Sequence, residues 1–119
     1  MSSTIVQYVV VRGDLISALK WPTGALIAQA CHACTAAIHT FYQDEVTQQY
    51  LSDLDSMHKV ILEAKNEESL RELSESLTQD GIQHKLWMEQ PEDIATCVAA
   101  KPYTKQEVQK YFKKFKLFK

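Results

Sequence analysis

Four apolar runs along the chain predict β-strands. Residues 5–11 (Ile-Val-Gln-Tyr-Val-Val-Val) are nearly continuous and β-branched, which is typical of a central strand covered on both faces. Residues 59–64 predict a second strand. Residues 83–88 and 95–100 predict a third and a fourth, and the proline-containing stretch between them suits the turn of an antiparallel hairpin.

Apolar side chains at helical spacing predict helices between these strands. A long helix is expected over residues 23–42, where Thr23 can cap the first turn and Gly24 leaves that turn open to other groups. Residues 15–22, which precede it, are expected to form a loop. Asp44 is a suitable N-cap for a second, shorter helix.

Two further helices are predicted in the second half of the chain. Asn66 caps a helix with three leucines at core positions, and Gly81 suits a left-handed C-terminal cap. Thr104 and Glu107 form a capping box before the last helix, whose apolar and aromatic side chains repeat at helical spacing. We expect that helix to pack through its aromatic face and to show its lysines outward.

The predicted order of elements is β-α-α-β-α-β-β-α. Helices join the first strand to the second and the second to the third, and such crossovers between parallel strands are almost always right-handed. The sequence therefore predicts an α/β fold, with a small mixed four-stranded sheet and helices on both faces. At this length we expect residues 1–119 to form a single domain.

The composition is that of an ordinary globular protein, with 45% hydrophobic and 24% charged residues. The sequence contains neither an apolar run long enough to cross a membrane nor the pattern of a secretory signal. Three cysteines without framework spacing favour a reducing compartment. We therefore expect a cytoplasmic protein that does not associate with a membrane.

The formal charge of −2 conceals a basic C-terminal segment. Residues 101–119 contain seven lysines against the single acidic residue Glu107, whereas the preceding hundred residues carry six basic and fourteen acidic side chains. Such a segment can meet phosphates or an acidic partner. The alternative is a solvated helix face with a frayed end.

Four polar side chains are candidates for chemistry. Gln29 and His32 lie one turn apart on an otherwise apolar helix, near the carboxyl end of the first strand, where α/β proteins usually have their sites. An imidazole there can act as acid or base near neutral pH. Glu89 and Thr96 add a carboxylate and a hydroxyl from the hairpin. The pattern alone leaves open that all four are structural.

Cys31 and Cys34 form a C-x-x-C motif, for which redox and metal functions must be weighed. A redox thiol needs the helix N-terminus to lower its pKa, but Cys31 lies about two turns inside the helix. A zinc site needs four ligands, which only Cys97 and a histidine could complete. Packing in the core is the alternative for all three thiols.

Several motifs occur in an order that matches a known family. Val-Val-Val-Arg12-x-Asp14-Leu is followed by Gly24-x-x-x-Ala-Gln29-x-x-His32-Ala, then by Thr96-Cys-Val and a later proline. This order resembles the archaeal and eukaryotic type-2 peptidyl-tRNA hydrolases almost from end to end. The resemblance implies a compact α/β domain, often a homodimer, that cleaves the ester between a peptide and the 3′ ribose of a tRNA without a metal or other cofactor.

The resemblance also assigns roles by position. It implies that Gln29, His32, Glu89 and Thr96 are the catalytic residues, with Glu89 at the place of the family's Asp. Substrate-binding positions, also implied by this resemblance, are Lys20, Thr23, Gly24, Arg12 and Asp14.

Two departures from the family pattern bear on activity. The helix start Gly-Lys-Gly-Lys of the family is replaced by residues 22–25, so that Ala25 stands where the family has a lysine, and Lys20 is the nearest substitute. The family's Asp-Ala-Gly-x-Thr loop is shortened to residues 89–93. The alternative hypothesis is therefore a weakened or inactive member of the family that binds tRNA or a protein partner.

Overall fold

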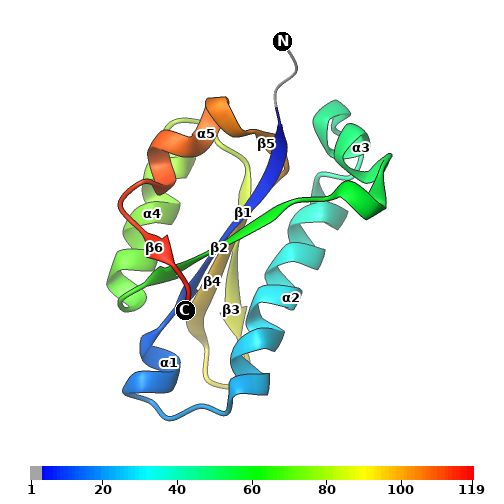
Figure 1. Cartoon of the computed structure of the whole chain (residues 1–119). Helices are drawn as coiled ribbons and strands as arrows, with labels where there is room; N and C mark the ends of the chain where they lie inside the picture. The colour runs from blue at the N-terminus through cyan, green and yellow to red at the C-terminus, as the bar shows by residue number, and fades with distance from the viewer. Residues whose placement is uncertain (1–3) are drawn as a thin grey trace.

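The computed structural model describes residues 4–119 as a mixed β-sheet with helices on both faces (Figure 1). The order of the main strands is β3-β4-β1-β2-β6, and β5 pairs separately with β1. The strands are β1 (Ile5–Arg12), β2 (Lys59–Ala64), β3 (His84–Glu89), β4 (Ile94–Ala100), β5 (Tyr103–Thr104) and β6 (Lys116–Leu117). The α/β class is confirmed, but the prediction of four strands is wrong because the sheet has six.

The strand directions match the predicted connections. β1 and β2 are parallel, with Gln7 opposite Lys59 and Arg12 opposite Ala64. β4 runs antiparallel to β1 on the other side, and β3 and β4 form the predicted antiparallel hairpin. β1 is therefore a central strand, and all its residues from Val6 to Arg12 are buried.

Residues 4–119 form five α-helices and one short 3₁₀ helix beside the sheet. They are α1 (Asp14–Ser17), α2 (Thr23–Thr40), α3 (Glu45–Leu51), η1 (Leu54–Ser56), α4 (Glu67–Gln79) and α5 (Lys105–Phe112). The prediction of a loop over residues 15–22 is wrong at its start, because α1 (Asp14–Ser17) covers residues 15–17. Within the described residues, no helix is long and apolar enough to cross a membrane.

The helices divide the core into two layers, one on each face of the sheet (Figure 1). Val9 and Val11 of β1 pack with Leu26 and Ala33 of α2 on one face. The neighbouring β1 side chains point to the other face and pack against α4 and α5, where the line of Leu70, Leu73 and Leu77 is fully or almost fully buried.

Three of the predicted caps are confirmed. Asp44 accepts hydrogen bonds from two backbone amides at the start of α3, and Asn66 accepts one at the start of α4. Gly81 adopts a positive φ of 71° after α4, as a left-handed cap requires.

Two other caps differ from the prediction. The N-cap of α2 is Pro22, so that Thr23 is already helical and caps nothing. Thr104 is the N-cap of α5, but its hydroxyl donates to the Glu107 side chain at 3.3 Å rather than accepting from a backbone amide.

Candidate active site

A buried hydrogen bond joins two of the predicted site residues across the α2–β4 contact. The Thr96 hydroxyl donates to Gln29 Oε1 at 2.8 Å, and Gln29 Nε2 donates to the Ala25 carbonyl at 3.0 Å. Gln29 is 1% exposed and Thr96 is fully buried. The pair therefore fixes the first turns of α2 over the start of β4.

The other two predicted site residues are linked through Trp87 of β3. The exposed His32 ring stacks on the Trp87 indole, with ring centroids 4.9 Å apart and an interplanar angle of 21°. The indole nitrogen in turn donates to Glu89 Oε1 at 2.9 Å. The imidazole and the partly buried carboxylate thus lie at the two ends of one aromatic contact, beside the Gln29–Thr96 pair.

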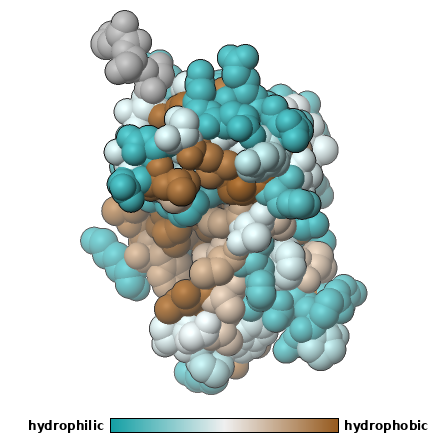
Figure 2. Space-filling model, turned by 90° about the vertical axis from the view of Figure 1, so that its right-hand side faces the viewer, coloured by the Kyte–Doolittle hydropathy of each residue, from teal (hydrophilic) through white to brown (hydrophobic). Residues whose placement is uncertain are grey.

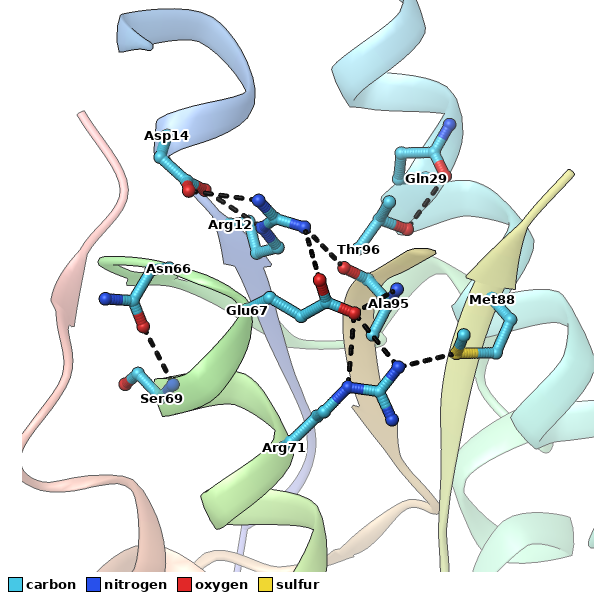
Figure 3. A network of polar contacts seen from close by, with 10 residues as sticks. All are labelled: Arg12, Asp14, Gln29, Asn66, Glu67, Ser69, Arg71, Met88, Ala95 and Thr96. Atoms are coloured by element: carbon cyan, nitrogen blue, oxygen red, sulfur yellow. Dashed lines mark hydrogen bonds and ion pairs between the residues drawn. The ribbon is translucent and has the colours of Figure 1, made fainter. Parts of the chain in front are cut away.

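An ion-pair network lies on the opposite side of β4 from α2 (Figure 3). Arg12 is buried and forms two hydrogen bonds to the Asp14 carboxylate, at 2.9 and 3.0 Å, and one to the Ala95 carbonyl at 3.0 Å. Glu67 lies 3.6 Å from the Arg12 guanidinium and also accepts from Arg71 and from the Ala95 amide. Both backbone polar groups of Ala95 are therefore bound by charged side chains.

This network bears directly on the site because Ala95 precedes Thr96. Charge-assisted hydrogen bonds to the amide and the carbonyl of Ala95 fix the backbone of β4 at this residue (Figure 3). They thereby also fix the direction in which the Thr96 side chain points. The amide of Ala95 is the main cause that lowers the pKa of Glu67, and Arg71 and Arg12 lower it further. Glu67 therefore stays ionised to a lower pH than a free glutamate.

The predicted substrate-binding residues separate into two groups. Arg12 and Asp14 are hydrogen-bonded to each other and belong to the ion-pair network of Figure 3. Lys20, Thr23 and Gly24 are exposed at the start of α2, and the space beside Gly24 is open. The start of an 18-residue helix carries partial positive charge, so this second group can meet an anion.

The geometry of the described residues gives no support to a redox or metal site at the cysteines. Burial raises the pKa of the Cys34 thiol, whereas a redox nucleophile needs a lowered pKa. Cys97 is fully buried, and burial also raises the pKa of its thiol. Among residues 4–119, no three His, Cys, Asp or Glu side chains are grouped so as to hold a metal ion.

The basic C-terminal segment is only partly a surface feature. Lys101 is 3% exposed and pairs with Asp44 at 2.8 Å, so it belongs to the interior. The other lysines of the segment are exposed. Val108 and Phe112 form the buried face of α5, as the helical spacing predicted.

Sequence reasoning missed two residues of this region, Trp87 and Glu67. The alternation of side chains along β3 places Trp87 on the same face as Glu89, but its stacking partner comes from α2, far away in the sequence. Glu67 looks like an ordinary acidic residue in the first turn of a helix. Its contact with Ala95, 28 residues away, has no local signal.

Comparison with known proteins assigns the chain to a family. A family model described as "Peptidyl-tRNA hydrolase PTH2" matches residues 5–118, and the chain belongs to this family. The resemblance inferred from the motifs is therefore confirmed.

Two relatives, one from Mus musculus and one from Homo sapiens, are similar over nearly the whole chain. Both carry the name "Putative peptidyl-tRNA hydrolase PTRHD1". Each is 57% identical over 116 residues, which cover 97% of this chain and 83% of the relative.

Proposed function

We propose that this chain is a peptidyl-tRNA hydrolase that cleaves the ester between a peptide and the 3′ ribose of a tRNA. The observation that carries the proposal is the contact between α2 and the β3–β4 hairpin, in a chain that belongs to the PTH2 family. That contact joins Gln29 to Thr96 and links His32 to Glu89 through Trp87. A base, a carboxylate and a fixed polar pair thus lie in one region.

The proposed reaction begins with a water molecule that loses a proton to His32 or Glu89. The resulting hydroxide attacks the ester carbonyl carbon and forms a tetrahedral oxyanion. The bond from that carbon to the ribose 3′ oxygen then breaks, and the departing oxygen takes up the proton. One Glu89 oxygen accepts from the indole, which leaves the other oxygen of the carboxylate for the water.

Gln29 and Thr96 orient the ester in this proposal by fixing where α2 meets β4. Their side chains bind each other in the interior. Their contribution therefore acts through the position of the helix relative to β4.

The tRNA backbone is proposed to bind at the start of α2. Lys20, Thr23 and Gly24 are exposed there, next to the amino end of the helix dipole. Ala25, where the family has a lysine, supplies no charge, so Lys20 and the exposed C-terminal lysines take the role of phosphate contacts. No metal or other cofactor takes part in the proposed reaction.

We further propose that residues 1–119 act as a single domain, as a homodimer, in the cytoplasm. The proposal of a reducing compartment rests on the three cysteines, none of which is in a disulfide. Light scattering coupled to size exclusion tests the dimer, and a fluorescent fusion imaged in cells tests the location.

The decisive experiment measures hydrolysis of a defined peptidyl-tRNA by the wild type and by His32→Ala and Glu89→Gln. Loss of a general base slows such reactions by roughly 10²–10⁴-fold. His39→Ala is the matched control, because His39 is exposed on the same helix but lies near its opposite end.

The proposal fails if the wild type releases no peptide from a substrate that an active type-2 enzyme cleaves in the same assay. Salt-dependent tRNA binding without turnover would then support the non-catalytic alternative.

A further inference from the structure

A long apolar groove lies along α2, and neither His32 nor Trp87 is among the residues that line it. Its volume is about 900 Å³, within the range of small-molecule binding sites. One wall is α2, the floor includes Val11 and Ile61 from β1 and β2, and Phe118 closes the far wall. Figure 2 looks at the α2 side of the molecule and shows hydrophobic surface bordered by hydrophilic side chains.

The two ends of this groove differ in character. Leu26 and Ile27 line the end beside the start of α2, and Phe118 lies next to Ile61, whose carbonyl accepts from the Phe118 amide at 3.0 Å. Lys59 and His39 lie toward the other end, where α2 finishes and α3 begins. The groove is therefore amphipathic along its length, with an apolar channel that leads to a polar end.

The amine of Lys59 is held in place by two fixed acceptors. It donates to Oε1 of Gln7, a fully buried residue whose amide nitrogen is bound to the Ala100 carbonyl at 3.0 Å. It also lies 3.4 Å from the Tyr50 hydroxyl, which itself donates to the His58 carbonyl. Lys59 is exposed as a residue, but its amine is bound to these two groups.

Lys59 also lacks an ion-pair partner among residues 4–119, whereas the buried cations Lys101 and Arg12 are paired. Burial lowers the pKa of the Lys59 amine, and the thiols of Cys34 and Cys31 offset part of that shift. A partly desolvated cation without a carboxylate gains from a bound anion, because the anion replaces the lost hydration.

We propose that this groove binds a long-chain monocarboxylate, with the carboxylate on Lys59 Nζ and the alkyl chain along α2 toward Phe118. The charge of Lys59 selects an anionic head, and the apolar remainder of the groove accepts a chain without polar atoms. A peptide segment would bring backbone polar groups into this apolar channel and leave them without partners. The proposal does not rest on the hydrolase activity.

Octanoate and decanoate, used below the concentrations at which they form micelles, are suitable probes in isothermal titration calorimetry. We expect saturable binding of one molecule per chain, with affinity that rises about two- to fourfold for each added methylene. Decan-1-ol and decyltrimethylammonium, which keep the chain but lack the negative charge, should bind at least tenfold more weakly than decanoate.

Variants locate the binding site. Lys59→Met should weaken decanoate at least tenfold, since a hydrogen bond to a charged group is lost, whereas Lys59→Arg should retain most of the affinity. Lys85→Met is the matched control, because Lys85 is exposed on β3 at the opposite edge of the sheet. Decanoate should also slow alkylation of the exposed Cys31, which lines the groove.

Three results would overturn the proposal. The first is equal binding of decanoate and decan-1-ol, and the second is unchanged decanoate affinity in Lys59→Met. The third combines three observations: light scattering shows a dimer, Cys31 resists alkylation without any ligand, and the protein binds no decanoate. A second copy of the chain would then occupy the groove.

Discussion

Replacement of Thr96 by valine tests whether the α2–β4 contact depends on the buried hydrogen bond. Valine keeps the shape of threonine but removes the donor to Gln29 Oε1. Because both side chains are almost completely buried, water cannot take the place of the lost hydroxyl. A buried acceptor left without a partner costs about 1–3 kcal/mol of stability.

The complementary change, Gln29→Met, leaves the Thr96 hydroxyl without its acceptor and should cost a similar amount. The double variant removes both polar groups and should lie within about 1 kcal/mol of the wild type, because matched apolar replacement of a buried pair is nearly neutral. The loss of the bond from Gln29 to Ala25 occurs in both Gln29→Met backgrounds and cancels. We therefore expect a coupling energy of at least about 1 kcal/mol.

Urea unfolding of the four proteins measures this cycle. For a typical m-value, a loss of about 2 kcal/mol lowers the unfolding midpoint by about 1 M urea. Additive effects, with the double variant as unstable as the sum of the single variants, would refute the reasoning, because residues that do not interact show no coupling. Unchanged m-values are required for the comparison.

Three further predictions follow from other contacts. Ala25→Lys should raise kcat/KM for peptidyl-tRNA about tenfold or more if the missing lysine limits transition-state stabilisation, and Ala28→Lys on the same helix should not. Because its pKa is lower in the folded protein, ionised Glu67 stabilises the fold fully above its unfolded pKa near 4.3, and this stabilisation is lost as pH falls through the folded pKa. Glu67→Gln should therefore make the free energy of unfolding less dependent on pH below about pH 5, which acid titrations followed by circular dichroism can measure. Asp44→Ala leaves the buried Lys101 charge unpaired and removes a helix cap, so thermal or urea unfolding should show that the free energy of unfolding falls by about 3–5 kcal/mol. Asp44→Asn keeps the cap and should cause a smaller loss.

Local signals in the sequence were enough for the larger elements of the fold. The strand at residues 59–64 was predicted with its observed bounds, and the caps at Asp44, Asn66 and Gly81 were predicted from their side chains. In each case the determinant lies within a few residues. The spacing of apolar side chains and the helix caps are both determined by residues within one or two turns of each other in the sequence.

The elements that were missed lack such local determinants. β5 and β6 contain two residues each, which is too short for an alternating pattern. β5 pairs with Ile5 and Val6, at the end of β1 that β4 does not cover, and β6 pairs with the outer edge of β2. α1 is a four-residue helix without a side-chain cap. Thr23 was expected to cap α2, but Pro22 takes that position because its fixed φ and the lack of an amide proton suit the start of a helix.

The site divided in the same way between local and distant determinants. The spacing of Gln29 and His32 in the sequence predicted that they share one face of α2. In the structure, the β3–β4 hairpin brings Glu89 and Thr96 close to them. The connection through Trp87 was not predictable, because stacking across two elements depends on how far α2 lies from β3.

The buried pair of Gln29 and Thr96 is more informative about function than about stability. Apolar side chains of the same shape should hold α2 on β4 about as well, since a buried polar pair gains little over a matched apolar one. If the double variant keeps its stability and loses peptidyl-tRNA hydrolysis, the pair is required for the site rather than for the fold. The fold could then tolerate its loss at this position of α2, while the reaction could not.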